Sequence, residues 1–354
     1  MTGAVLSLAQ RVREDLPGAG PLTPLLADPA VTDVLVNGRD VWVDRGGGLV
    51  RAAVPVGTPH DVRRLAQRLA AAAGRRLDDG CPFVDARLPD GTRLHAVLPP
   101  VAVGGPYLSL RTFRHRAFSL GELVAAGTVS SAGAGVLAAI VAARLAYLVT
   151  GGTGAGKTTV LSTLLGLVPR DERIVLVEDA AELRPVHPHV AALQVRTSNV
   201  EGAGEVGLRT LVRQALRMRP DRLVIGECRG PEVVDLLGAL NTGHEGGAGT
   251  LHANNPRDVP ARLEALGLLG GIPRAALHAQ LAAALQVVVH VRRTESRERV
   301  VEQVCLLVPD ARRGLVVAAP AWHRTEGAGP AAAALARLLV DRGVPAPGAL
   351  DGRP

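Results

Sequence analysis

Apolar and polar residues alternate in several short runs over the first third of the chain. The alternating runs lie at residues 31–36, 41–43, 93–98 and 107–113. Such alternation is typical of strands that bury one face. Between the runs, residues 60–73 carry apolar side chains at helical spacing behind Thr58, a residue type that caps helix N-termini. We therefore predict a small α+β domain over residues 21–117, preceded by an N-terminal helical segment over residues 1–20.

A different pattern begins near residue 130, where short apolar strands alternate with helices. The strand-like segments are 146–150, 173–177, 223–225 and 249–252. The helical segments are 159–167, 206–218, 231–240 and 257–268. This alternation predicts a doubly wound parallel sheet of the RecA-like type over residues 130–310. A capped helix at residues 119–127 occupies the linker predicted over residues 118–129.

The remaining residues, 311–354, are predicted as a C-terminal extension. Within it, the pattern indicates an edge strand at residues 314–318 and a short helix at residues 331–342. The last dozen residues are expected to be a frayed tail.

The only lysine among 40 basic residues closes the run G-G-T-G-A-G-K-T, a Walker A P-loop. A bias toward arginine alone does not explain this position, because composition would place the required neighbours around one lysine in roughly one case in a thousand. The run also lies between a predicted strand and a predicted helix, as phosphate binding requires. We expect ATP and Mg²⁺ as ligands, with Lys157 at the outer phosphates and the Thr158 hydroxyl on the metal. The expected nucleotide contacts are Gly151, Gly152, Thr153, Gly154, Ala155, Gly156, Lys157, Thr158 and Thr159.

Acidic residues follow two of the predicted strands. Glu178, Asp179 and Glu182 come directly after residues 174–177, and Glu227 follows residues 223–225. We expect Glu178 and Asp179 to contact the nucleotide. Ligands bind at the carboxyl edge of such sheets, and hydrolysis needs acids there to hold Mg²⁺ and orient water. An acidic turn on its own is more often merely solvated, but the P-loop favours the catalytic interpretation.

Two further groups of residues are candidates for contacts with phosphate. His244 and His252 flank a strand of small residues and are expected at the same sheet edge, as a sensor of the γ-phosphate. A histidine metal pair is less favoured, because no carboxylate or cysteine stands at ligand spacing. Arg209, Arg213 and Arg217 recur every fourth residue along one helix face, which can equally be a solvated basic face.

Four of these motifs, in this order, resemble the secretion ATPase superfamily of type II and type IV secretion systems and type IV pili. They are the P-loop at residues 151–158, the acidic turn at residues 178–182, the strand followed by Glu227, and the histidine-containing run at residues 242–253. The runs L-P-D-G-T-R-L-H-A-V-L-P-P, N-V-E-G-A-G-E-V, L-V-R-Q-A-L-R-M-R-P-D-R and H-A-N-N-P-R-D look most like its tight-adherence (Tad) pilus assembly branch. The resemblance covers residues 31–308. It implies an α/β fold, a RecA-like P-loop NTPase domain preceded by a smaller α+β N-terminal domain. It also implies a homo-hexameric ring whose ATP hydrolysis drives pilin extrusion or export through an inner-membrane platform protein.

The resemblance also implies roles for individual residues. Glu182 matches the catalytic glutamate, Glu227 the Walker B acid that shares Mg²⁺ with Thr158, and His252 the catalytic histidine, with His244 as its partner. The matching candidates for phosphate-clamping arginines are Arg93, Arg111, Arg213 and Arg217. Two departures from relatives are expected: the run reads G-G-A-G-T where hydroxyl residues are usual, and the long disordered N-terminal extension of many relatives is missing. The absence of the zinc-binding tetracysteine insert of type II motors points again to the tight-adherence branch.

Composition limits the remaining possibilities. The net charge of +7 permits binding to nucleic acid or to an anionic membrane, but aromatic residues make up only 2%, so stacking platforms for bases are scarce. Cys81, Cys228 and Cys305 have no paired spacing, which favours structural thiols in a reducing cytosol. The longest apolar stretch, 136–150, contains Arg144 and is too short to span a bilayer.

We therefore expect a cytoplasmic protein without a transmembrane segment, peripherally associated with the inner face of the cell membrane and without direct nucleic-acid binding. Two alternatives remain open. One is a DNA-translocating RecA-like ATPase of a conjugation-type system, and the other is a non-hydrolysing, nucleotide-gated docking ring.

Overall fold

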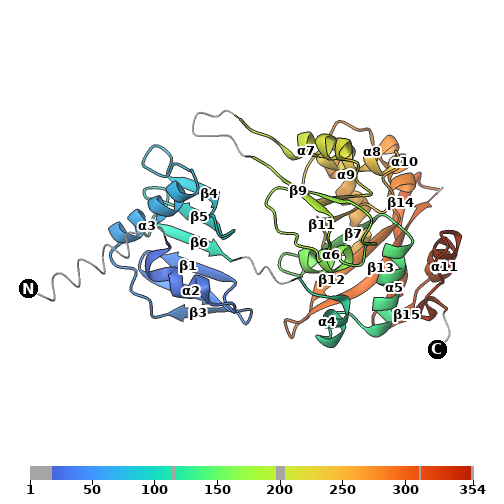
Figure 1. Ribbon diagram of the computed structural model, residues 1–354, viewed down its shortest axis with the longest axis horizontal. Coiled ribbons are helices and arrows are strands. Elements are labelled where there is room, and N and C mark those ends of the chain that lie inside the picture. Colours follow the sequence, from blue (N-terminus) through green and yellow to red (C-terminus); the bar gives the residue numbers. More distant parts are fainter. Residues whose placement is uncertain (1–17, 113–116, 197–203, 311, 352–354) are drawn as a thin grey trace, which may run out of the picture. The chain divides into compact units, whose positions relative to one another are not determined.

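The chain folds into two compact units, shown as a ribbon in Figure 1. The computed structural model describes residues 18–112, 117–196, 204–310 and 312–351. The first unit comprises residues 1–115 together with 199–203, and the second comprises residues 116–198 and 204–354. The N-terminal helical segment predicted over residues 1–20 lies largely outside the described residues.

The first unit contains a six-stranded antiparallel sheet in the order β3-β2-β1-β6-β5-β4. Its strands are β1 (Asp33–Asn37), β2 (Asp40–Asp44), β3 (Leu49–Ala52), β4 (Phe83–Arg87), β5 (Arg93–Val97) and β6 (Tyr107–Arg111). Its helices are η1 (Gly20–Leu22), α2 (Thr23–Ala27) and α3 (Pro59–Ala72). Alternate side chains of β1, β2, β5 and β6 are buried and share one core with the apolar face of α3.

Local sequence signals account for most of this unit. Thr58 and Asp61 form a reciprocal capping box at the start of α3, which confirms the predicted helix to within one residue at each end. The predicted strands at residues 93–98 and 107–113 correspond to β5 and β6. Strand β3 was not predicted, because none of its four side chains is fully buried and the alternation is lost.

The second unit contains a nine-stranded sheet in the order β15-β14-β13-β12-β7-β11-β10-β8-β9. Its strands are β7 (Tyr147–Gly151), β8 (Ile174–Glu178), β9 (Val190–Gln194), β10 (Arg222–Cys228), β11 (Ala248–His252), β12 (Val287–Arg293), β13 (Arg299–Asp310), β14 (Leu315–His323) and β15 (Gly327–Ala328). Strands β7 to β12 are parallel, and β13 to β15 continue the sheet in antiparallel fashion. The predicted RecA-like parallel sheet is thus confirmed, with an antiparallel addition of which the sequence pattern predicted only β14.

Helices cover both faces of this sheet. They are α4 (Leu120–Ala125), α5 (Ser131–Ala142), α6 (Lys157–Leu165), α7 (Leu208–Ala215), η2 (Leu216–Met218), α8 (Glu232–Leu240), η3 (Pro256–Asp258), α9 (Val259–Leu269), α10 (Arg274–Ala284), α11 (Ala332–Asp341) and η4 (Gly348–Leu350). One hydrophobic core lies beneath α5, α6 and α11, and a second lies beneath α7, α8, α9 and α10. The sheet therefore forms the middle of three layers.

The C-terminal part differs from two expectations. The strand predicted at the sheet edge is β14, which lies between β13 and β15 rather than at the edge. The last residues were expected to be frayed, but η4 places Leu350 in the core at 3% exposure. Apolar residues at the end of the chain gain more from that burial than from solvent exposure. Over the described residues, every helix is too short or too polar to cross a bilayer.

Candidate functional site

The glycine-rich loop connects the carboxyl end of β7 to the first turn of α6. Strand β7 is buried along its whole length between β12 and β11. Gly151 must lack a side chain, because a Cβ there would lie 2.2 Å from the carbonyl oxygen of Val291 on β12. Gly156 caps α6 in the left-handed region, with φ +100°. The nine predicted nucleotide contacts, from Gly151 to Thr159, therefore form one continuous turn at a helix N-terminus, where backbone N–H groups bind phosphate.

Lys157 begins α6, and its ammonium turns back onto the loop. Its Nζ donates to the carbonyl oxygens of Gly151 (3.1 Å) and Gly152 (3.0 Å). Burial lowers the pKa of this ammonium, and the charges of Glu227 and Glu182 oppose the shift. Carboxylates act on a pKa in this way only from nearby positions. Lys157, Glu182 and Glu227 thus lie at the same carboxyl edge of the sheet, close enough for the two carboxylates to raise the pKa of the ammonium.

The acidic segment after β8 is a turn organised by its first residue. Glu178 is 3% exposed, and its Oε1 accepts hydrogen bonds from the backbone N–H groups of Glu182 (2.9 Å) and Leu183 (3.0 Å). Asp179 is exposed and Glu182 is half-buried. Glu178 was expected to contact nucleotide, but its side chain instead binds the backbone of its own turn, because the last residue of β8 is still covered on both faces.

Glu227 lies near the end of β10, two strands from the glycine loop. Its side chain is 23% exposed, and its Oε2 accepts a hydrogen bond from Arg229 Nε at 2.6 Å. The register of β10 against β11 shifts between Ile225 and Cys228, which spaces the residues around Glu227 irregularly along the edge. Next to it, Thr250 Oγ1 donates to the Gly226 carbonyl at 2.6 Å and ties β11 to β10.

The two histidines of the predicted phosphate sensor lie at opposite edges of the sheet. His252 pairs in register with Gly151, at the end of β11 beside the glycine loop. His244 precedes the start of β11, where its Nδ1 contacts the Ala239 carbonyl at 3.3 Å. The strand alone separates these positions by about 13 Å at 3.3 Å per residue. The expectation that both histidines face the same edge is therefore wrong, because one precedes the strand and the other ends it.

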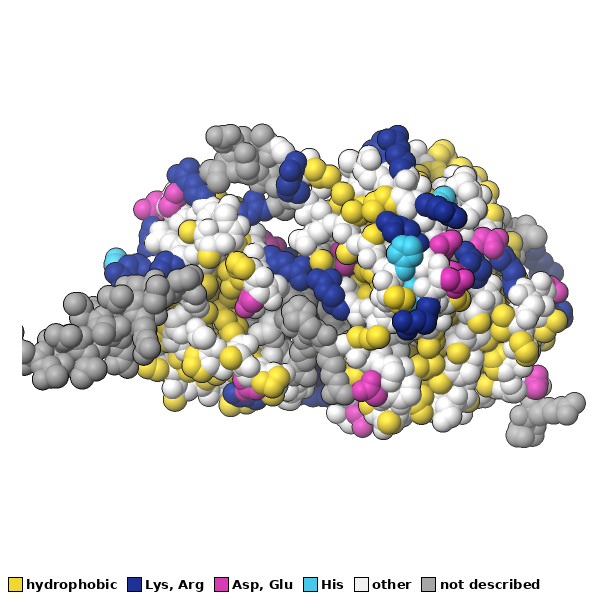
Figure 2. All heavy atoms as spheres, in the orientation of Figure 1, with side chains coloured by type: hydrophobic (Ala, Val, Ile, Leu, Met, Phe, Trp, Pro, Cys, Tyr) yellow, Lys and Arg dark blue, Asp and Glu magenta, His cyan; other side chains and the backbone are white. Residues whose placement is uncertain are grey.

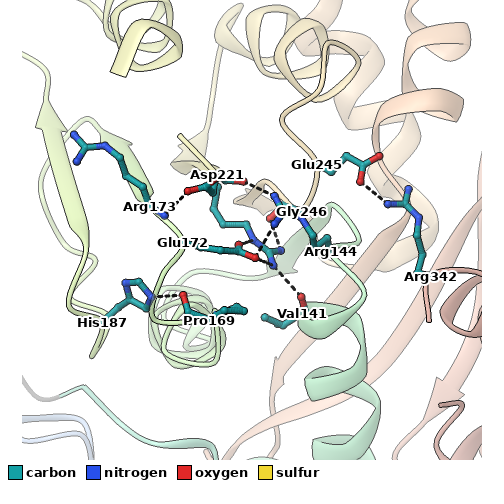
Figure 3. A network of polar contacts seen from close by, with 11 residues as sticks. Val141, Arg144, Pro169, Glu172, Arg173, His187, Asp221, Glu245, Gly246 and Arg342 are labelled. Carbon is teal, nitrogen blue, oxygen red and sulfur yellow. Dashed lines mark hydrogen bonds and ion pairs between the residues drawn. The ribbon is translucent and has the colours of Figure 1, made fainter. Parts of the chain in front are cut away.

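The amino edge near His244 is occupied by a network of ion pairs, shown in Figure 3. Glu172 lies between two arginines: its Oε2 accepts from Arg222 Nε at 2.5 Å, and its Oε1 accepts from Arg144 Nη1 at 2.6 Å. Arg222 is 1% exposed and also donates to the carbonyls of Val141 and Gly246. Figure 3 also shows Glu245 paired with Arg342, and the Asp221 carboxylate accepting the backbone N–H of Arg173. We interpret the network as structural.

The four candidate clamping arginines are distributed over both units. Arg93 and Arg111 belong to β5 and β6 of the first unit, where Arg93 pairs with Asp85 at 2.8 Å. Arg213 is exposed on α7, and Arg217 is exposed on η2. The expected row along one helix face is interrupted, because α7 ends at residue 215 and a tighter helix follows.

Two side chains near the loop were not predicted from the sequence. Arg299, the first residue of β13, donates from Nε to the Gly154 carbonyl at 3.0 Å. His290 on β12 is buried and contacts the Thr150 hydroxyl at 3.0 Å, and burial lowers its pKa. Both lie more than a hundred residues along the chain from their partners. Local patterns give no signal for such contacts.

The fold and this edge define the class of the protein. A glycine loop with its lysine follows a central strand of a RecA-like sheet, and two acidic residues lie at the carboxyl ends of β8 and β10 in the same sheet. The second unit is therefore a RecA-like P-loop NTPase domain. The chain belongs to the type II/IV secretion system protein family, whose model matches residues 15–319.

Individual relatives agree with this assignment. A putative conjugal transfer protein of Mycobacterium tuberculosis is 57% identical over 345 residues, which cover 96% of this chain and 97% of the relative. Protein VirB11 of Agrobacterium fabrum is 31% identical, over 67% of this chain and 76% of its own length. The type IV secretion system protein PtlH homolog of Bordetella bronchiseptica is 31% identical, over 79% and 92%.

Solved structures share the fold. The ATPase DotB of Yersinia pseudotuberculosis superposes with a TM-score of 0.59 at 17% identity, over 82% of this chain and 79% of its own. The pilus retraction motor PilT with bound ADP gives a TM-score of 0.57 at 21% identity, over 82% and 83%.

Proposed function

We propose that this protein is a motor ATPase, which hydrolyses ATP at the carboxyl edge of the second sheet and uses the reaction to drive a secretion-type machine. One observation carries the proposal. The ammonium of Lys157 lies on the glycine loop, and Glu182 and Glu227 lie at the same edge of the sheet, after β8 and near the end of β10. Phosphoryl transfer needs this combination, a cation that binds the outer phosphates and acids that hold the metal and orient water.

The residues at the loop suit a magnesium nucleotide. A side chain at Gly151 would meet Val291, and a side chain at Gly156 would meet Arg299. The loop can therefore keep the conformation that turns its backbone N–H groups toward phosphate only because both residues are glycines. Thr158 and Glu227 would hold Mg²⁺, because hydroxyl and carboxylate oxygens are the ligands it prefers. When bound, the metal supplies positive charge that stabilises the transferring phosphoryl group.

Each remaining residue then has a definite task. Lys157 exchanges the two loop carbonyls for phosphate oxygens. Glu182 accepts a proton from the attacking water and orients it. His252, next to the loop on β11, donates a hydrogen bond to the terminal phosphate and so links β11 to that phosphate.

Turnover by the purified full-length chain tests the proposal. We expect Mg²⁺-dependent release of phosphate from ATP in the wild type. Glu182→Gln and Glu227→Gln should each lower kcat by about 100-fold or more while nucleotide still binds, because they remove a proton acceptor or a metal ligand. Glu245→Gln, at the amino edge, is the matched control and should retain turnover. An inert wild type, with or without membranes, would instead support a nucleotide-gated docking ring.

We further propose which machine the motor drives. The tight-adherence resemblance supports a homo-hexamer that acts on an inner-membrane platform protein during pilus assembly, at the cytoplasmic face of the membrane. Light scattering with and without nucleotide tests the hexamer, and co-purification with an inner-membrane platform protein tests the partner. A monomer under all nucleotide conditions would contradict the ring.

A second candidate is a DNA-translocating motor of a conjugation-type system. The relatives named as conjugal transfer proteins favour it. Figure 2 shows Lys and Arg side chains spread over both units on the face in view, with acidic side chains beside several of them, rather than one basic stripe. Strong stimulation of turnover by DNA with a steep salt dependence would favour this candidate over pilus assembly.

A further inference from the structure

Glu178 is a buried acidic residue at the carboxyl edge of the second sheet. It has no direct role in the proposed hydrolysis of ATP. Its side chain is 3% exposed at the end of β8. One oxygen, Oε1, accepts two backbone N–H groups, from Glu182 and Leu183. The other, Oε2, is buried and has no hydrogen-bond partner. Burying an ionised carboxylate without a cation costs far more than burying a neutral acid, whose Oε1 still accepts both backbone N–H groups while Oε2 carries the proton.

We propose that Glu178 is a positioning residue that works as a neutral carboxylic acid and fixes the turn that carries Glu182. The inference rests on the proposed catalytic role of Glu182. Because the two amide hydrogen bonds end at residues 182 and 183, they set the backbone from which the catalytic carboxylate projects. A shift of about 1 Å in a catalytic group can cost about 100-fold in rate.

The neighbouring strand is shaped to receive this side chain. Gly226 on β10 lies beside Glu178, and a Cβ there would come within 2.6 Å of the Glu178 Cγ. The Gly226 carbonyl is itself held by the Thr250 hydroxyl of β11 at 2.6 Å. The side chain is therefore packed against β10 at a fixed position, rather than free to turn toward solvent.

The charges around Glu178 favour the neutral form. Burial raises its pKa from the ordinary 4.5 to about 7, the charge of Glu182 adds to the rise, and the two amides and Arg184 oppose it. On β10, the residue after Gly226 is the acidic Glu227. Thr250 on β11 and Gln194, the register partner of Glu178 on β9, are uncharged. Among the described residues, Glu178 has no ion-pair partner. A magnesium-free triphosphate nearby would raise the pKa further.

Three variants of the full-length protein test the proposal. Glu178→Ala should lower kcat by about 10- to 100-fold with little change in the KM for ATP, because the turn loses its two acceptor contacts. Glu178→Gln keeps a neutral side chain with an acceptor oxygen and should restore most of that loss. Glu172→Gln is the matched comparison, because Glu172 is a mostly buried glutamate that is paired with Arg222 and Arg144. It should lower the Tm, whereas Glu178→Gln should not.

The pH dependence of unfolding provides a readout that does not depend on turnover. An acid with a raised pKa binds its proton more tightly in the folded state, so it stabilises the protein at low pH and loses that contribution as pH rises through about 7. The Tm of Glu178→Gln relative to wild type should therefore increase between about pH 5 and pH 8.

The outcomes separate the two proposals. If Gln is as damaging to kcat as Ala, or if the Tm difference between Glu178→Gln and wild type does not change between about pH 5 and pH 8, the carboxyl is ionised throughout and the inference is wrong. Unchanged kcat in Glu178→Ala would also overturn it. If the wild type shows no turnover, the proposed function fails, and the catalytic half of the inference fails with it. The pH dependence of unfolding still decides whether the carboxyl is neutral.

Discussion

Replacing Glu172 by glutamine should destabilise the second unit substantially without touching the nucleotide edge. Arg222 is 1% exposed, and Glu172, 13% exposed, is its only carboxylate partner within the described residues. The glutamine amide keeps one acceptor oxygen but no charge, so the guanidinium of Arg222 is left buried and uncompensated. Arg144 loses its ion pair in the same step.

The magnitude follows from what Arg222 retains. Breaking a buried ion pair by removing one partner costs about 3–5 kcal/mol. Arg222 keeps its donations to the Val141 carbonyl (3.2 Å) and the Gly246 carbonyl (3.4 Å), and the amide oxygen supplies a third acceptor. We therefore expect the lower end, about 3 kcal/mol in the free energy of unfolding. For a unit of this size that is a drop in Tm of about 6–12 °C.

Chemical denaturation followed by circular dichroism measures this loss. The matched control is Glu245→Gln, which breaks the pair with Arg342 in the same region of the sheet. That pair is exposed, at 33% and 51%, so its loss should cost at most about 1 kcal/mol. If both variants lose the same small amount, burial does not govern the strength of these pairs and the structural interpretation of the network is wrong.

Two further predictions concern the glycine loop. Gly151→Ala places a Cβ against the Val291 carbonyl, so we expect a loss of more than about 2 kcal/mol in unfolding together with loss of nucleotide binding; calorimetry measures both, and normal ATP affinity would contradict the predicted clash. Arg299→Ala removes the donor to the Gly154 carbonyl and a positive charge beside the loop, so the Kd for ATP should rise about 3- to 10-fold with little change in Tm. Arg293→Ala, exposed on the neighbouring strand β12, is its control and should leave the Kd unchanged.

The sequence predicted those features of the fold that depend on neighbouring residues. The P-loop was located because its glycines and lysine lie within one short run, and α3 was located because apolar residues at helical spacing follow the cap residue Thr58. Strand β12 was not predicted, since V-V-V-H-V is buried on both faces and shows no alternation. The contact of Arg299 with the loop spans 145 residues, and only the folded sheet brings the two together.

The position of His244 at the amino edge could have been predicted from the sequence. In a parallel sheet, residues that follow a strand lie at the carboxyl edge and residues that precede it lie at the amino edge. His252 ends β11 and His244 precedes it, so counting from the strand would have separated them. The sequence interpretation instead grouped them because both flank the same small residues.

The charged side chains at the two edges of the second sheet have different kinds of partner. At the amino edge, Glu172 and Glu245 each have an arginine partner, and the charges contribute to folding. At the carboxyl edge, the Lys157 ammonium is held by carbonyls, so it can exchange them for phosphate at little electrostatic cost. Substitutions of charged side chains at the amino edge should therefore be detected in unfolding, and substitutions of charged side chains at the carboxyl edge in turnover. Glu178 connects the two classes, because a buried side chain there sets both the packing of β8 against β10 and the position of Glu182.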